Sequence, residues 1–176
     1  MPIWRQLALP VAAMIAVVVA SNVAVQFPIN DWLTWGAFTY PFAFLVTDLS
    51  NRAFGPGRAR QVILAGFLLG VVLSIAASTP RIAIASGSAF LVAQLLDVMI
   101  FNRMRRLEWW RAPLASSLIA SAVDTMLFFG LAFAATGLPW VTWAVGDYAA
   151  KLAMAAILLL PYRALVRHMP QWQAAA

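Results

Sequence analysis

Four aspartates and one lysine lie inside long apolar stretches of the sequence, where an ionisable side chain is unusual. They are Asp48, Asp97, Asp124, Asp147 and Lys151. If these stretches cross a membrane, each charge costs about 2.5–3.5 kcal/mol at the centre of a helix on insertion scales, and such residues mark pathways for ions, protons or polar solutes. The excess of acids over bases favours a cation, a proton or a heterocycle rich in hydrogen-bond donors.

The acids belong to stripes of polar and aromatic side chains that recur at helical spacing. Asp48 and Arg52 are four residues apart, as are Asp147 and Lys151, so each pair could simply neutralise itself. Asp124 has no basic neighbour in sequence and needs a partner from another helix, a proton or water. The candidate binding residues on these stripes are Asn22, Gln26, Tyr40, Phe44, Asp48, Asn51, Gln94, Asp97, Asp124, Asp147 and Lys151.

Counting along each stretch at 1.5 Å per residue places the charges in depth. Asp124 and Lys151 fall about 17 Å from one boundary, near the midplane, where they can meet. Asp48 and Asp97 fall about 8 Å from the same boundary and can face each other. Stripes converging from five of six helices predict a central polar cavity.

The composition identifies the elements that must position these residues. Of 176 residues, 64% are hydrophobic and only 10% are charged, against about a quarter charged in an ordinary soluble domain. Six helices of about 20 residues would use about 120 residues, which leaves only short connections. We therefore expect an all-α membrane protein, a single integral domain over residues 1–176, with helices at about 6–28, 36–54, 61–79, 82–101, 113–135 and 142–162. The stretch at 61–79 is almost free of polar residues and is expected to be a scaffold or lipid-facing span.

The basic residues predict the orientation. Ten of them lie at the N-terminus, the C-terminus or the second and fourth connections, whereas Arg81 alone lies on the opposite side: Arg5, Arg52, Arg58, Arg60, Arg103, Arg105, Arg106, Arg111, Arg163 and Arg167. Lysine and arginine concentrate on the cytoplasmic side of a membrane, so both termini are expected inside. The net charge of +6 then reflects topology and not binding to nucleic acid. A cleaved signal peptide is the competing interpretation of the first stretch, but that stretch is long enough to span.

Several kinds of chemistry lack their residues. The chain has no cysteine and one histidine, His168, so no thiolate site or multi-histidine metal site is expected. It has no G-x-x-x-x-G-K-[ST], G-x-S-x-G or H-E-x-x-H motif. We expect no enzymatic activity and no cofactor, although the residue types allow an intramembrane hydrolase that uses Asp48 and Asp97.

Several separated motifs resemble one family. They are Trp35-Gly36-Ala37-Phe38-Thr39-Tyr40-Pro41-Phe42, Thr47-Asp48-Leu49, Asn51-Arg52, Phe54-Gly55, Gln94-Leu95-Leu96-Asp97-Val98, Phe101-Asn102-Arg103, Trp109-Trp110, Ala112-Pro113, Ser121 to Asp124-Thr125, Asp147-Tyr148 and Lys151. In this order, from about Ser21 to Pro161, they resemble the queuosine precursor transporter family, also described as a vitamin uptake transporter family.

The resemblance implies a multi-pass protein of the bacterial inner membrane that takes up 7-cyano-7-deazaguanine, 7-aminomethyl-7-deazaguanine or both. A carboxylate, from Asp124 or Asp97, would then accept the two donors of the guanine-like edge. Lys151, Asn51 or Gln94 would donate to the base carbonyl, Tyr40 or Phe44 would stack on the ring, and a second aspartate would neutralise an aminomethyl group.

Two alternatives to a solitary carrier stay open. The size resembles the substrate-binding subunits of energy-coupling-factor importers, and Ala12, Ala16 and Ala20 form a small-residue face suited to helix docking. The chain could also be a non-transporting subunit of a membrane assembly, with its polar stripes serving as interhelical contacts. The partners expected are the small base and membrane lipid; no residue supports a homodimer, which stays a further alternative.

Overall fold

A computed structural model describes residues 3–77, 79–169 and 171–172. Its helices are α1 (Ile3–Ala24), α2 (Gly36–Thr39), α3 (Pro41–Phe54), α4 (Pro56–Ala77), α5 (Pro80–Met104), α6 (Arg111–Phe133) and α7 (Trp140–Val166). The first two and last few residues of the expected 1–176 domain, and position 78 of the expected 61–79 helix, lie outside the described residues.

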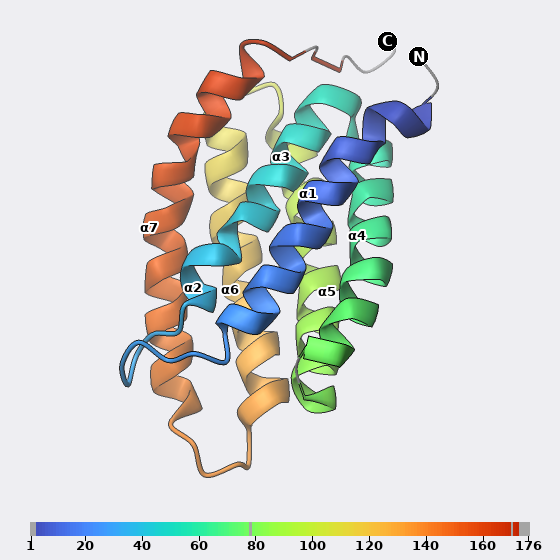
Figure 1. The fold of residues 1–176 in the computed structure, drawn as a ribbon. Coiled ribbons are helices and arrows are strands. Elements are labelled where there is room, and N and C mark those ends of the chain that lie inside the picture. The colour runs from blue at the N-terminus through green and yellow to red at the C-terminus, as the bar shows by residue number, and fades with distance from the viewer. Residues whose placement is uncertain (1–2, 78, 170, 173–176) are drawn as a thin grey trace.

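The helices pack side by side as a bundle (Figure 1). If α2 and α3 are taken as one interrupted helix, the described residues form the six helices expected from the sequence. Four described segments are long and apolar enough to cross a membrane: Gln6–Ala24, Pro80–Met104, Arg111–Phe133 and Trp140–Val166. The all-α class is therefore confirmed. Both ends of the described chain lie at one end of the bundle, called here the terminus end; the opposite end, with residues 25–35, is the loop end (Figure 1).

The expected single helix at 36–54 is interrupted at Tyr40. Pro41 has no N–H to donate, so the backbone hydrogen bonds of α2 end with Tyr40 N–H to Gly36 O at 3.0 Å. Tyr40 itself keeps helical dihedrals, and α3 begins at Pro41. The interruption lies where Tyr40 enters the polar interior of the bundle.

Other helix boundaries differ from the expected ones for local reasons. The first helix ends at Ala24 and not at 28, because residues 25–35 form an ordered connection in which Asn30 Oδ1 accepts the N–H groups of Trp32 and Leu33 at 2.8 and 2.9 Å. The helix expected from 61 already begins at Pro56, since proline favours the first position of a helix. The last helix continues through Pro161 to Val166.

Helices α1 and α4 pack closely against each other at the periphery of the bundle. A Cβ atom on Gly66 would lie 2.3 Å from Met14 Cγ, and one on Gly70 would lie 2.8 Å from Val18 Cγ1. Small residues four apart let two helix backbones approach closely. The apolar side chains of Leu64, Leu68 and Val72 are exposed on the surface of α4. Their exposure agrees with the scaffold or lipid-facing role expected for this helix.

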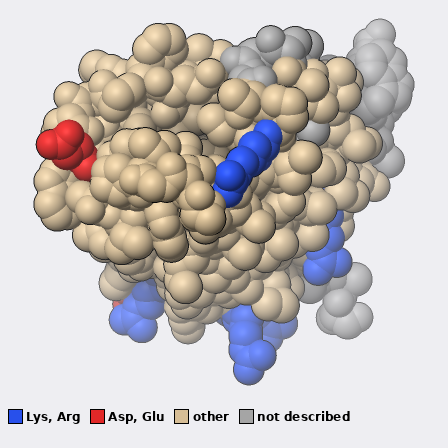
Figure 2. Space-filling model, turned by 90° about the horizontal axis from the view of Figure 1, so that it is seen from below, with Lys and Arg blue, Asp and Glu red and all other residues tan. Residues whose placement is uncertain are grey.

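The two ends differ in charge. The loop end is almost uncharged (Figure 2), and its Arg81 donates to the carbonyls of Leu131 and Ala134 at 3.1 and 2.7 Å, at the C-terminus of α6. Cations stabilise helix C-termini, so a local structural contact accounts for this isolated arginine.

The terminus end carries the arginine-rich connections, and residue 172 packs against it. Trp172 donates its N–H to Arg52 O at 3.0 Å and its ring lies 4.9 Å from the Arg105 guanidinium. Burial, followed by the charge of Arg52, lowers the pKa of Arg105 from its ordinary value.

Candidate functional site

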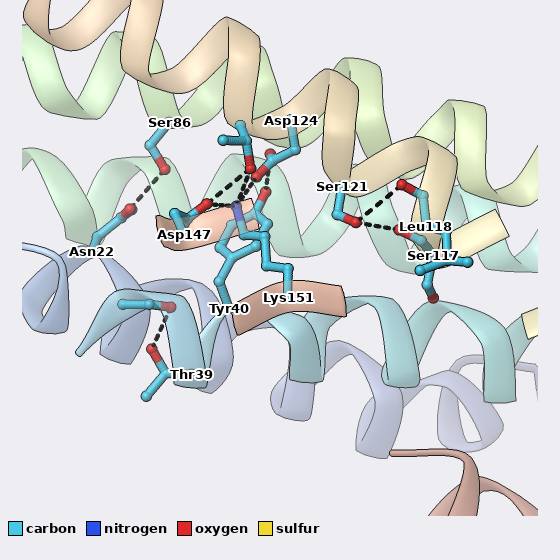
Figure 3. Close-up of polar contacts among 12 residues, drawn as sticks. Asn22, Thr39, Tyr40, Ser86, Ser117, Leu118, Ser121, Asp124, Asp147 and Lys151 are labelled. Carbon is cyan, nitrogen blue, oxygen red and sulfur yellow. Dashed lines mark hydrogen bonds and ion pairs between the residues drawn. The ribbon is translucent and has the colours of Figure 1, made fainter. Parts of the chain in front are cut away.

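A lysine and two aspartates meet in the middle of the bundle, and we call them, with Tyr40 and Thr125, the lysine cluster (Figure 3). Lys151 Nζ lies 2.8 Å from Asp124 Oδ2 and 2.5 Å from Asp147 Oδ2. All three side chains are buried. Asp124 comes from α6 and the other two from α7, so the expected contact of Asp124 with Lys151 across helices is confirmed.

Two hydroxyl groups complete the lysine cluster. Tyr40 donates to Asp124 Oδ1 at 2.8 Å, and the Lys151 ammonium lies 5.0 Å from the centre of its ring. Thr125 donates to Asp147 Oδ2 at 2.8 Å and accepts from Lys151 at 3.0 Å. The interrupted helix, α6 and α7 are thereby joined through one buried network.

The lysine cluster has one carboxylate more than it has cations. With both aspartates ionised and Lys151 charged, the cluster carries a net charge of −1. A buried charge is costly unless it is paired, so the cluster suits a ligand that brings a positive charge or several hydrogen-bond donors.

A cavity on the loop side of the lysine cluster is lined by Asn22, Ser86, Tyr40, Asp124, Asp147 and Lys151, with Ser21, Val25, Gly36 and Phe128. Ser86 Oγ donates to Asn22 Oδ1 at 2.6 Å. We call this the loop-side cavity. Asp124 and Asp147 both line this cavity, so it presents carboxylate groups that can accept hydrogen bonds.

A second cavity lies on the other side of Lys151, toward the terminus end. It is lined by Phe44, Asp48, Ser117, Ser121, Lys151 and Tyr162, together with Pro41, Leu45, Pro113, Ala155, Leu158 and Leu159. We call this the terminus-side cavity. Because Lys151 lines both cavities, the lysine cluster is the partition between them.

Both cavities are narrow in this conformation. The loop-side cavity has about 300 Å³ of empty volume and the terminus-side cavity about 370 Å³, but the centre of a water molecule can occupy only about 30 and 20 Å³ of them. That is room for one or two waters. A bicyclic base requires the helices to separate on one side.

The connection at residues 25–35 begins at Val25, which lines the loop-side cavity, and it contacts α7 at Gly146. A Cβ atom on Gly146 would lie 2.0 Å from Trp32 O, so only glycine allows the connection to approach α7 here. Gly146 directly precedes Asp147 in the lysine cluster.

Asp48 and Asp97 form a separate carboxyl pair nearer the terminus end, with their carboxyl groups within hydrogen-bonding reach of each other. Asp48 accepts long hydrogen bonds from Ser116 at 3.4 Å and Ser117 at 3.5 Å. Both oxygens of Asp97 are buried without a hydrogen-bond partner among the described residues. The expected facing of these two aspartates is confirmed.

The ion pair between Asp48 and Arg52, which their four-residue spacing allows, does not form in the described structure. Among the described residues Asp48 forms no ion pair, and Arg52 donates to Arg105 O at 3.0 Å. The long side chain of Arg52 extends to the terminus end, where it binds a backbone carbonyl group and does not pair with the buried carboxylate of Asp48.

Three expected binding residues lie away from the lysine cluster. Asn51 accepts from Arg105 through its side chain and its carbonyl, and Gln94 accepts from Thr47. Gln26 is exposed and donates to Asn22 O at 2.9 Å. Among the residues described, neither Asn51, Gln94 nor Gln26 lines the two cavities beside Lys151.

Tyr162, Thr125 and Ser116 were not candidate binding residues in the sequence, although Thr125 belongs to one of the motifs of the resemblance. Tyr162 follows Lys151 by eleven residues, about three helical turns, and this spacing placed it on the same face. Ser116 and Thr125 are small polar residues in an apolar helix, and only the packing of α6 against α3 and α7 shows that they meet carboxylates.

A profile of the family described as "Putative vitamin uptake transporter" matches residues 34–78 and 72–166. The chain is 35% identical to the "Queuosine precursor transporter" of Escherichia coli (strain K12), over 87% of this chain and 82% of that protein. The chain belongs to this transporter family. It is also 36% identical to the "Probable queuosine precursor transporter" of Haemophilus influenzae, over 84% of this chain and 80% of the relative.

A third relative is more distant. The family member of Bacillus subtilis (strain 168), also named "Probable queuosine precursor transporter", is 28% identical over 77% of this chain and 72% of its own length. No solved structure matches the chain. The resemblance read from the motifs is confirmed, and membership of a transporter family agrees with the expectation that the chain is not an enzyme.

Proposed function

We propose that the chain takes up 7-deazaguanine precursors of queuosine, with a cyano or an aminomethyl group, across the bacterial inner membrane into the cytoplasm. The names of its relatives support the substrate class. The observation that carries the proposal is the lysine cluster, a buried site of net negative charge with a cavity on each side.

The carboxylates of the lysine cluster match the donors of such a base. A guanine-like edge presents two parallel N–H donors, and a carboxylate can accept both. Asp147 lines the loop-side cavity, and its Oδ2, which Lys151 and Thr125 contact, would become available if these two groups turned to the ligand. We assign Asp147 to the guanine-like edge and Asp124 to the balance of the remaining positive charge.

Other groups of the loop-side cavity suit the rest of the base. The Lys151 ammonium can donate to the ring carbonyl. Tyr40 and Phe128 line the cavity with aromatic surface, which favours a flat ring. Asn22 and Ser86 supply amide and hydroxyl groups at the loop end of the cavity.

The two cavities provide a route if they open alternately. The base would enter on the loop side, exchange contacts at Lys151 and leave on the terminus side. The arginine-rich terminus end is assigned to the cytoplasm because basic residues concentrate there. Loss of the contact between Trp32 and Gly146 would open the loop side.

Thermal unfolding of the detergent-purified protein tests the binding site. A ligand that binds only the folded state stabilises it by about 2.7 kcal/mol at a hundredfold excess over Kd. We expect one or both deazaguanine bases to raise Tm and guanine and adenine to raise it much less. Asp147→Asn should abolish the shift and Asp31→Asn, in the exposed connection, should keep it. Absence of a shift in the wild-type protein would contradict the proposal.

One observation favours a subunit that borrows an ATPase module. Ala12, Ala16 and Ala20 of α1 are exposed and form the small-residue face expected from the sequence. Proteoliposomes that contain this chain alone decide between the two functions. Base uptake there supports a solitary carrier, and binding without uptake supports the subunit.

A further inference from the structure

The carboxyl pair of Asp48 and Asp97 is a buried site that binding of the base leaves unused. Asp97 is fully buried, and both its oxygens lack a hydrogen-bond donor among the described residues. The Asp48 carboxyl is within hydrogen-bonding reach, yet two carboxylates are both acceptors. Their contact becomes a hydrogen bond only when one of them holds a proton.

The charged surroundings do not neutralise the carboxyl pair. Lys151 and Tyr162 from α7 line the same cavity as Asp48, but Lys151 is held in ion pairs by Asp124 and Asp147. Arg52 and Arg105 lie near enough to Tyr162 to act on it electrostatically. Both arginines donate to backbone carbonyls, Arg52 to Arg105 and Arg105 to Asn51. From α6 the pair receives only the hydroxyl groups of Ser116 and Ser117.

A second observation, on α7, also indicates that a hydrogen-bonding partner is missing from this site. The Tyr162 hydroxyl is buried, has no hydrogen-bond partner in the described chain and lines the terminus-side cavity together with Asp48. Adjacent like charges in a site of low dielectric cannot both ionise without a large cost. We propose that Asp48 and Asp97 bind one exchangeable proton, and that binding of the base at the lysine cluster releases this proton.

Lys151 connects the carboxyl pair to the lysine cluster, because Lys151 and Asp48 line the same cavity with Ser117 and Ser121 between them. When the base forms hydrogen bonds with the carboxylates of the lysine cluster, the Lys151 ammonium loses its ion pairs with them. An opposite charge nearby favours the ionised form of a carboxyl group. The pair then releases its proton to the terminus side, and its charge changes from −1 to −2.

A proton fits this site better than a metal ion. The terminus-side cavity leaves about 20 Å³ for the centre of a water molecule, and no group of three or more potential metal-binding side chains occurs in the described residues. A proton needs no such space, and the hydroxyls of Ser116, Ser117 and Tyr162 surround it.

A pH dye in a weakly buffered solution of the purified protein tests the inference, which rests on the proposed function. Addition of the neutral cyano base to the wild-type protein should acidify the solution as the base binds, by up to one proton for each base bound. Asp97→Asn should still bind the base, as measured by the rise in Tm, but should release no proton. Asp31→Asn is the matched control and should behave as the wild type.

The outcomes separate the two proposals. Failure of the wild-type protein to bind the base overturns the proposed function. Binding of the base without release of a proton overturns the proton site alone. If Asp97→Asn does not fold, Asp48→Asn replaces it, and infrared spectroscopy of the wild type gives an independent measurement. A protonated-carboxyl band that disappears on base binding is expected, and its absence at neutral pH would contradict a proton held by the pair.

Discussion

The stability of the lysine cluster depends on one cation, since Lys151 alone offsets two buried carboxylates at 2.8 and 2.5 Å. Removing one member of a buried ion pair is far more costly than removing the whole pair, because the remaining charge stays unpaired. Substitutions at Lys151 and at its two partners should therefore have unequal effects.

Lys151→Met should lower the free energy of unfolding by about 3–5 kcal/mol, as for other buried charges that lose their partner, and should abolish uptake. Chemical denaturation in detergent measures the first effect. The same lysine substitution combined with Asp124→Asn and Asp147→Asn should recover most of the stability and none of the uptake. A single variant as stable as the wild type would show that the carboxylates are not held ionised by Lys151.

Tyr40→Phe removes a donor to Asp124 and keeps the aromatic ring beneath Lys151. Hydrogen bonds to charged groups are worth about 1.5–3 kcal/mol, so we expect a stability loss in that range and a weaker base-induced rise in Tm. Tyr148→Phe is the matched control, because the hydroxyl of Tyr148 makes one long hydrogen bond within the described part of the chain, to Leu118 O at 3.4 Å. Equal effects of the two substitutions would contradict a special role for Tyr40.

At the scale of elements, depth counting predicted the contacts that depend only on helix rise. Asp124 meets Lys151, and Asp48 meets Asp97, because residues at equal depth on facing helices are brought together by packing. The possible Asp48–Arg52 pair does not form, because the four-residue spacing allows a contact but does not determine the side-chain rotamer, and Arg52 donates to Arg105 O instead. Tyr162 was missed because a lone tyrosine near a helix end has no pattern that separates it from a packing residue.

The break between α2 and α3 also shows how far the sequence alone can predict the structure. Pro41 indicated an interruption, but Tyr40 keeps helical dihedrals beside it, and only the structure shows that the break coincides with the lysine cluster. Discontinuous helices are common at the binding sites of transporters, where the interruption leaves backbone groups available to contact the substrate.

The contact of the 25–35 connection with α7 gives a prediction for an element. Gly146→Ala places a Cβ atom where Trp32 O lies 2.0 Å away, so the connection must move outward at an overpacking cost of about 1–3 kcal/mol. A cysteine introduced at Val25, which lines the loop-side cavity, should then react faster with a thiol reagent. Gly130→Ala, where nothing lies within 4 Å of the added atom, should leave that rate unchanged. Unchanged labelling in Gly146→Ala would show that the contact does not cover the cavity.

On the scale of the whole molecule, the orientation can be tested with single cysteines because the chain has none of its own. Leu138 lies near the loop end and Leu107 near the terminus end, and they are similarly exposed at 45% and 47%. In intact cells an impermeant maleimide should label Leu138→Cys, whereas Leu107→Cys should react only after permeabilisation. The reverse pattern would overturn the assignment of the terminus end to the cytoplasm.

The difference in charge between the two ends also affects the rate at which a base associates with the loop end. A surface of one charge sign steers an ion over several ångströms and makes its association rate depend on salt. The loop end offers little such field, since Arg81 is engaged by the carbonyls of α6 and few other charges lie there (Figure 2). A cationic aminomethyl base and a neutral cyano base should therefore reach this end by unguided diffusion, at rates that differ little from each other and hardly change as the Debye length is shortened from about 30 to about 8 Å.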